Sequence, residues 1–242
     1  MPELFAALLA VIAGAVASIA GFGIGSLLTP FLTVGYGANL AVAAVSIAHF
    51  FGTALRFWRL KAHIDRKTLV HFGVLSALGG LTGAVFHAFI SSPGMAAILG
   101  GILVFAGTLG VTGSSEKMRF KGRVAWFAGA LSGFFGGLVG NQGGIRSAAM
   151  LGFDLSKESY VATATAVGLI VDVSRMPVYF FIERGRLLHL WPLILVMSLG
   201  TLAGTLAGTF LLSWIPEKIF KRLVSGIVVL LGLFTLIQAF HD

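Results

Sequence analysis

One stretch decides how this chain is organised: Gly136-Gly137-Leu138-Val139-Gly140-Asn141-Gln142-Gly143-Gly144-Ile145-Arg146. It places five glycines, two amides and an arginine within eleven residues of a very apolar sequence. Glycine lets a backbone turn or approach a ligand closely, and the N–H groups of an unwound glycine run can point at an anion. Arg146 adds a permanent, fork-shaped cation. The stretch therefore predicts an interrupted helix beside an anion site.

An earlier stretch has the same character: Gly21-Phe22-Gly23-Ile24-Gly25-Ser26. It also lies in the middle of a long apolar segment and repeats the close spacing of glycines. We interpret the two stretches as the facing halves of one anion site inside a membrane. The residues expected to contribute from them are Gly21, Gly23, Gly25, Ser26, Asn141, Gln142, Gly143, Gly144 and Arg146.

The composition indicates a membrane protein. Of 242 residues, 57% are hydrophobic and 11% are charged, and the mean hydropathy is +0.97, far too apolar for a soluble domain. The net charge of +8 lies mainly between apolar segments, so it predicts membrane topology rather than a nucleic-acid partner. The chain has no cysteine, which excludes disulfides and thiolate metal sites.

The apolar segments are of two lengths. Residues 4–34 and 124–153 are each about 30 residues long with glycines in the middle, whereas one crossing takes about 20 residues. We expect each to form a broken, re-entrant hairpin of two part-depth helices, which is tolerated at depth when it lines a cavity. Six full spans are predicted near residues 41–58, 69–90, 95–112, 160–182, 187–212 and 219–240.

The two halves of the chain resemble each other. Gly79 and Gly83 recur as Gly200 and Gly204, and other glycines recur in the same order at offsets of 115 to 125 residues. The predicted fold is therefore all-α and polytopic, with two inverted repeats that each contain one glycine-rich hairpin and three spans. The first repeat covers residues 1–113 and the second covers 124–242, and a basic linker over 114–123 joins them.

Charge predicts the orientation of these repeats. In this arrangement, thirteen Lys and Arg residues lie in joints on one side of the membrane and two, Arg184 and Arg186, on the other. The positive-inside rule places the basic side in the cytoplasm and both termini outside. A full crossing by the first element of each half would give a weaker split of eleven to four. The cations from Arg56 to Lys67 are interpreted as a cytoplasmic face against anionic lipid.

Charged residues inside the predicted spans are the strongest functional candidates, because charge in a bilayer is costly and faces a cavity or a partner. Asp172 and Arg175 lie three residues apart and share one helix face. They form either a structural ion pair or a site in which Arg175 binds the anion and Asp172 carries a proton. Arg146 is interpreted as an anion ligand, with a structural pair as the alternative.

Hydroxyl groups and one histidine complete the predicted site. Ser46, Thr163 and Thr165 are candidates to line it, although hydroxyls in membrane helices often bond to their own backbone. His49 follows Ser46 by one helical turn and is a candidate proton carrier, with a satisfied core histidine as the alternative. We find no nucleotide-binding, zinc-binding or catalytic motif. We therefore expect no enzyme activity, no cofactor and no metal.

The arrangement resembles a known family. The hairpin that holds Gly21 to Gly25 and Pro30, the hairpin that holds Gly136 to Gly144, and the later pairs Gly79-x-x-x-Gly83 and Gly200-x-x-x-Gly204 are similar to the sulfite exporter TauE/SafE family. This family is also called the toluene-sulfonate uptake permease family. The resemblance covers nearly the whole chain and implies a multi-pass carrier in the bacterial inner membrane.

The resemblance also implies a substrate, namely sulfite, a sulfonate or a related sulfur oxyanion. We therefore predict a secondary transporter, an exporter that is coupled to protons and moves one repeat against the other. The alternatives are a passive anion channel and a non-transporting membrane subunit. The expected partners are the anion and the lipid bilayer, without nucleic acid, and a homo-oligomer is as compatible with the sequence as a monomer.

Overall fold

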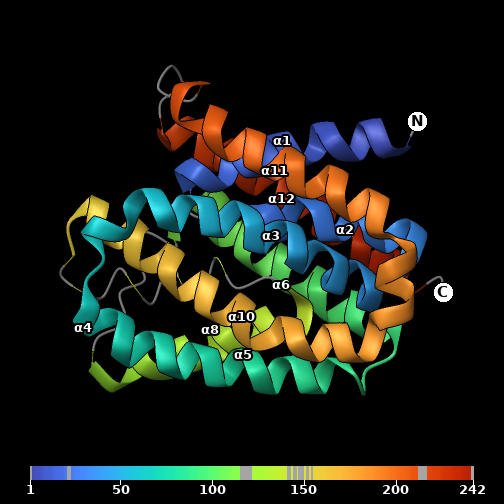
Figure 1. Ribbon diagram of the computed structural model, residues 1–242, viewed down its shortest axis with the longest axis horizontal. Coiled ribbons are helices and arrows are strands. Elements are labelled where there is room, and N and C mark those ends of the chain that lie inside the picture. The colour runs from blue at the N-terminus through green and yellow to red at the C-terminus, as the bar shows by residue number, and fades with distance from the viewer. Residues whose placement is uncertain are drawn as a thin grey trace.

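A computed structural model describes residues 2–20, 23–114, 122–140, 143, 146, 150, 153, 155–211 and 217–240 of the chain. Within these residues the fold is a bundle of helices joined by short connections, and it contains no strand. Figure 1 shows the long helices running along a common direction, with α4 at one end of the bundle. The expected all-α class is confirmed.

The first part of the chain forms five apolar helices of 13 to 23 residues. Their bounds are α1 Pro2–Ala20, α2 Ile24–Tyr36, α3 Ala38–Leu60, α5 Val74–His87 and α6 Ser92–Thr112. A 3₁₀ turn over Lys61–His63, the short α4 Arg66–Thr68 and a π turn over Leu69–Gly73 connect α3 to α5. The second part forms α8 Gly122–Val139, α10 Lys157–His189, α11 Trp191–Leu211 and α12 Glu217–Ala239.

Six helical segments of the described chain are long and apolar enough to cross a membrane. They are Ala38–His63, Arg66–His87, Ser92–Thr112, Gly122–Val139, Glu158–His189 and Trp191–Gly208. The protein is thus a multi-pass membrane protein. The set differs from the predicted one because α8 is long enough to cross by itself, while the apolar part of α12, Ser225–Ala239, is shorter than a full span.

Three pairs of helices pack unusually closely. The pairs are α1 with α11, α5 with α8, and α6 with α12. Glycines make this approach close: a Cβ at Gly79 or Gly83 would overlap a backbone carbonyl of α8, and a Cβ at Gly204 would overlap the carbonyl of Val11 on α1. Small residues of this kind let membrane helices approach without any gain from the hydrophobic effect.

Helices α3 and α10 form the centre of the bundle. They pack against each other, and α3 also packs on α2 and α11 while α10 packs on α5. The α3 segment is the most deeply buried of the six candidate spans. Polar residues on the facing sides of these two helices are therefore shielded from lipid, which is the position in which a membrane protein can hold charge.

One predicted boundary was wrong. The break expected between residues 182 and 187 does not occur, because α10 continues through the charged residues Glu183 to Arg186 and ends only at His189. Glu183 and Arg186 form an i, i+3 ion pair with 3.1 Å between Oε2 and Nη1, which supports the helix at this point. Gly185 also keeps the helical conformation.

The glycine run was expected to be unwound at Gly136, but the helix extends further. Gly136 and Gly137 lie inside α8, and the helix stops at Gly140, whose φ of 74° suits a residue without a Cβ. Gly137 stays helical because it packs against the carbonyl of Gly80 on α5. Close packing, rather than an open backbone, accounts for this part of the run.

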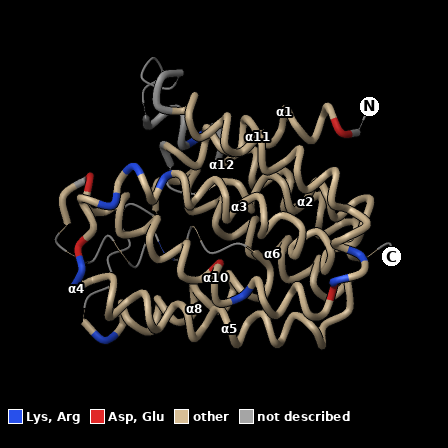
Figure 2. Tube along the Cα trace, in the orientation of Figure 1, with Lys and Arg blue, Asp and Glu red and all other residues tan. Residues whose placement is uncertain are grey.

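Basic residues are unevenly placed along the bundle. Figure 2 shows Lys and Arg gathered mainly at the end that carries α4, which we call the basic end. A smaller group with Arg184 and Arg186 lies at the opposite end, near the end of α10. Three further arginines, Arg56, Arg146 and Arg175, are buried.

Candidate functional site

The two glycine-rich stretches meet inside the bundle. Gly25, in the first turn of α2, lies so close to the carbonyl oxygen of Gly140 that a Cβ at position 25 would overlap it. Gly23 precedes α2 with a φ of 143°, a conformation that residues with a Cβ rarely adopt. The start of α2 and the end of α8 are therefore in contact, which brings the expected halves of the site together.

A charged centre lies between α3 and α10. Asp172 Oδ1 accepts hydrogen bonds from Nε and Nη2 of Arg175 at 3.1 and 2.7 Å. The other oxygen, Oδ2, lies 2.6 Å from Nδ1 of His49 on α3. Asp172 is fully buried and Arg175 nearly so, and the hydroxyl of Thr53 lies 3.4 Å from the same nitrogen of His49. The expected shared face of Asp172 and Arg175 is confirmed by this geometry.

The charged centre is tied to the end of α8 by backbone carbonyls. Arg175 Nη1 donates to the carbonyl of Gly136, and the Tyr179 hydroxyl donates to the carbonyl of Gly137. Both carbonyls lie near the C-terminal end of a helix, which carries partial negative charge and attracts a cation. The guanidinium of Arg175 is thus held by one carboxylate and one helix end.

A buried hydroxyl that the sequence did not single out lies beside this centre. The space where a Cβ would stand at Gly140 is bordered by Thr29 Oγ1 and Arg175 Nη1, each 3.7 Å away. Thr29 is fully buried, and its Oγ1 has no hydrogen-bond partner among the described residues. A buried hydroxyl in this state normally meets water or a ligand. In the sequence, the only feature that could have indicated Thr29 is its position one helical turn after Ser26.

Arg146 lies against α10 on the side of the charged centre that faces the basic end. It is 2% exposed, and its Nη1 lies within 2.8 Å of the position that a Cβ of Gly168 would occupy. The methyl group of Thr53 borders the same position at 3.7 Å. Glycine at 168 therefore leaves the room that the guanidinium of Arg146 fills.

Arg56 is a functional candidate whose predicted position at the surface was wrong. It was expected at a lipid-facing surface but is only 5% exposed. Its Nε donates to Thr165 Oγ1 at 3.1 Å, and its Nη1 donates to the carbonyl of Ala17 on α1. Helix α3 packs against α10 at this point, so position 56 lies within the bundle instead of at its rim.

The remaining predicted residues have different surroundings. Thr163 Oγ1 accepts from the backbone N–H of Asp65 at 3.0 Å, beyond Thr165 toward the basic end. Ser46 donates to the carbonyl of Ala43 on its own helix at 2.6 Å and borders an apolar groove between α3 and α10. Ser26 and Gly143 are buried. The following fall outside the described residues: Gly21, Asn141, Gln142 and Gly144.

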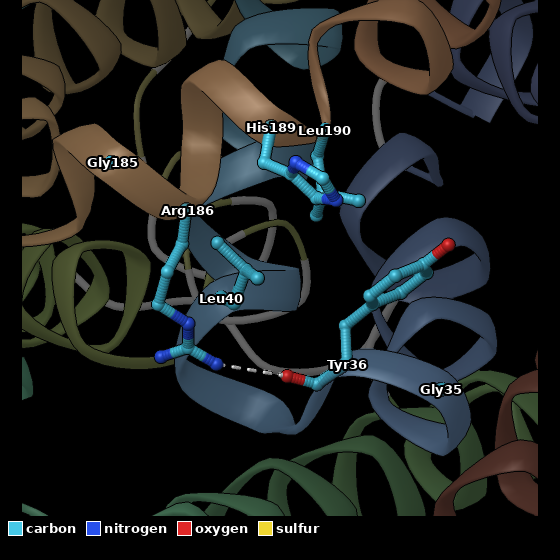
Figure 3. A pocket seen from close by; sticks show the side chains of 7 residues that line it. All are labelled: Gly35, Tyr36, Leu40, Gly185, Arg186, His189 and Leu190. Atoms are coloured by element: carbon cyan, nitrogen blue, oxygen red, sulfur yellow. Dashed lines mark hydrogen bonds between the residues drawn. The ribbon is translucent and has the colours of Figure 1, made fainter.

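A surface pocket lies at the end of the bundle opposite the basic end. It measures about 410 Å³ and lies where α2 and α3 meet α10. Figure 3 shows the Arg186 side chain reaching the carbonyl oxygen of Tyr36, with 3.3 Å between Nη2 and the oxygen, and the ring of His189 across the opening. The pocket is lined by Gly35, Tyr36, Leu40, Gly185, Arg186, His189 and Leu190.

Ionised side chains buried between the two central helices of a multi-pass bundle are typical of membrane transport proteins. The family model described as Sulfite exporter TauE/SafE matches residues 6–235, and the chain therefore belongs to this family. The family is one of membrane transporters. No curated protein and no solved structure matches the chain.

Proposed function

We propose that the protein is a secondary transporter that exports a small sulfur oxyanion, such as sulfite or an organosulfonate, across the bacterial inner membrane. One observation carries this proposal: the charged centre lies where the two glycine-rich stretches meet. Gly25 contacts the carbonyl of Gly140, and Arg175 borders the space beside Gly140. Family membership supplies the chemical class of the substrate.

The proposed central site combines a cation with neutral donors. Arg175 and the Thr29 hydroxyl both border the space at Gly140, so an oxyanion there would meet charge and a hydroxyl donor together. Hydrogen bonds to charged groups are roughly twice as strong as neutral ones. The other residues that we propose to contribute are Gly21, Gly23, Gly25, Ser26, Ser46, Asn141, Gln142, Gly143, Gly144, Arg146, Thr163 and Thr165.

We propose that His49 and Asp172 couple transport to protons. The ring nitrogen of His49 lies 2.6 Å from the carboxylate that neutralises Arg175. A proton added to this pair reduces the hold of Asp172 on Arg175 and leaves more of the guanidinium's charge for an anion. Histidine suits this role because its ordinary pKa lies near physiological pH.

The proposed mechanism uses two inverted repeats. In this scheme α1 corresponds to α8, α3 to α10, α5 to α11 and α6 to α12. Exchanging the two halves then turns the α1–α11 contact into the α8–α5 contact, and it maps the α3–α10 and α6–α12 contacts onto themselves. The recurring glycines follow this exchange, because Gly83 packs on α8 and Gly204 packs on α1.

Single cysteines at Lys67 and Arg222 should react from one side of the membrane and one at Arg186 from the other. Opposite-side reaction of the first two would reject the inverted repeat.

The test of function is flux into proteoliposomes of the purified protein. We expect uptake of radiolabelled sulfite that a pH gradient accelerates and that saturates with concentration. Asp172→Asn should retain exchange of anion for anion while losing the response to pH. A channel would conduct without saturation and ignore the gradient, and a non-transporting subunit would give the flux of empty liposomes.

A further inference from the structure

Arg56 and Arg175 make the same kind of contact in the two halves of the chain. Arg56 Nη1 donates to the carbonyl of Ala17 on α1, and Arg175 Nη1 donates to the carbonyl of Gly136 on α8. In both cases the arginine follows its carbonyl by 39 residues. Each carbonyl also lies three residues before the last residue of its helix. The last turn of a helix carries partial negative charge, so each arginine is placed to hold a helix end.

The correspondence extends to the preceding turn of each central helix. Thr53 precedes Arg56 by three residues, as Asp172 precedes Arg175. Nδ1 of His49 lies 2.6 Å from Asp172 Oδ2 and 3.4 Å from Thr53 Oγ1, so the two corresponding positions meet at one histidine. The chemistry of the two positions differs, because Arg175 has a carboxylate there and Arg56 has a hydroxyl.

The end of α1 supports the first glycine stretch. A Cβ at Gly23 would lie 2.6 Å from Cγ1 of Val16 and 3.6 Å from the backbone nitrogen of Ala17, so this glycine packs directly on α1. Gly25, two residues later, meets the carbonyl of Gly140, beside which the central site is proposed. A shift of the end of α1 would therefore shift the first half of that site.

We propose that Arg56 is the counterpart of Arg175 in the first repeat and a positioning residue for the central site. It holds the end of α1 through the carbonyl of Ala17, and α1 in turn holds the first glycine stretch against Gly140. This role rests on the proposed function, which supplies both the inverted repeat and the central site. Arg56 acts on the anion through α1 and needs no contact with the anion itself.

An arginine suits this connection because one guanidinium can bond two helices at once. Arg56 Nε donates to Thr165 Oγ1 on α10 at 3.1 Å, while Nη1 donates to Ala17 on α1. Two bonds from one planar fork fix the end of α1 relative to α10, and α3 carries the fork between them. Lysine has a single ammonium on a flexible chain, so Arg56→Lys can replace one bond but not the fixed geometry of both.

Amide hydrogen exchange of the purified full-length protein measures whether Arg56 holds α1. Arg56→Gln should speed exchange in residues 14–20 about tenfold, because the last turn of α1 loses the cation that holds it. Arg59→Gln, which removes an exposed arginine one turn further along α3, should leave exchange there unchanged. Arg175→Gln should act mainly on residues 133–139, in the corresponding turn of α8.

Anion binding measures the positioning role. Calorimetric titration with methanesulfonate should give a dissociation constant roughly fivefold higher in Arg56→Gln than in the wild-type protein, with the same number of sites per folded protein. Arg56→Lys should lie between the two, because it restores one bond. A residue that served folding alone would lower the number of sites and leave the dissociation constant of the remaining protein unchanged.

A second variant tests the same contact from the other side. If Arg56→Gln does not fold, Gly23→Ala should raise the dissociation constant in its place. Its φ of 143° and its contact with Val16 leave no room for a Cβ, so the alanine must push the glycine stretch away from α1.

Two results would overturn the positioning role. One is unchanged hydrogen exchange in α1 of folded Arg56→Gln, and the other is a wild-type dissociation constant for methanesulfonate in that variant. Sulfite flux by the wild-type protein alongside either result would leave the proposed function intact. Absence of wild-type sulfite flux together with the expected rise in the dissociation constant would reject transport and keep the positioning role.

Discussion

Two stretches of α10 hold arginines in opposite ways. From Asp172 to Tyr179 the helix supplies a carboxylate, so Arg175 is neutralised within its own turn and fixed by the carbonyl of Gly136. From Thr165 to Gly168 the helix supplies a hydroxyl and a position without a side chain, and Arg56 and Arg146 come to it from elsewhere. The first stretch pairs its cation with a carboxylate of the same helix, and the second receives cations that other parts of the chain carry.

The largest expected effect is in the first stretch. Asp172→Asn removes the carboxylate and leaves Arg175 buried without its counter-charge, which costs roughly 3–5 kcal/mol of unfolding free energy. Thermal unfolding of the detergent-solubilised protein measures this loss. Adding Arg175→Gln to Asp172→Asn should recover most of it, because the stranded charge is then gone. Failure of the double variant to recover would mean that Asp172 is not held mainly by Arg175.

The second stretch should respond through binding instead of stability. Gly168→Ala places a methyl group within 2.8 Å of Arg146 Nη1 and forces the guanidinium to move. We expect methanesulfonate affinity to fall roughly tenfold, about 1.4 kcal/mol, in calorimetric titrations. Gly185→Ala is the matched control on the same helix, since a Cβ there meets open space. Equal methanesulfonate affinities in the two variants would show that Arg146 does not contact the anion.

A smaller effect is expected from the hydrogen bond of Tyr179 in the first stretch. Tyr179→Phe keeps the ring next to Arg175 and His87 but removes the hydroxyl that bonds the carbonyl of Gly137. The loss should be about 1 kcal/mol of unfolding free energy. Tyr36→Phe, at a half-exposed ring, should change stability by less than half of that amount. An unchanged free energy of unfolding in Tyr179→Phe would mean that this hydrogen bond does not stabilise the contact with α8.

The smallest expected effect lies beyond the second stretch, where the N–H of Asp65 bonds Thr163. Asp65 Oδ1 caps α4 by accepting from the N–H of Thr68 at 2.7 Å, and this bond lowers the pKa of Asp65. Asp65→Ala should cost about 0.5 kcal/mol at neutral pH. Because the folded-state pKa is lowered, the cap contributes fully above the ordinary aspartate pKa. Its contribution falls as the pH drops through the lowered value.

Thermal unfolding of wild type and Asp65→Ala from pH 7 down to pH 3 tests this dependence. The difference between the two proteins should stay constant to about pH 5 and narrow below the ordinary aspartate pKa of about 4. Asp65→Asn keeps a capping oxygen, so its smaller difference from wild type should change less with pH. A difference that grows as the pH falls would contradict the assigned direction.

The sequence predicted the class of fold and the charged pair on α10 because both depend on local rules. Apolar segments of sufficient length must be helices in a bilayer, and residues three apart on a helix must share a face. The pairing of His49 with Asp172 could not be predicted from local rules, because it joins residues 123 positions apart. The sequence indicates both residues as proton carriers but contains no signal that brings them together.

Arg56 and Thr29 could not be found in this way. Arg56 belongs to a run of cations whose sequence is typical of a surface, and only the packing of α3 against α10 and the hydrogen bond of Arg56 to Ala17 show that this member lies inside. Thr29 is one hydroxyl among many on apolar helices. The break expected after residue 182 failed for a related reason, because charge marks the rim of a membrane but does not end a helix.

The close packing of α1 on α11 has a consequence for synthesis. About 190 residues separate the end of α1 from the end of α11, which at ribosomal rates is a delay of roughly 10–40 s. During this interval the glycine-bearing face of α1 has no permanent neighbour and must be shielded by lipid or by the insertion machinery. Helix α1 is thus synthesised well before the helix against which it packs. Truncations that remove α11 should leave α1 exposed to membrane proteases, although every residue of α1 is present.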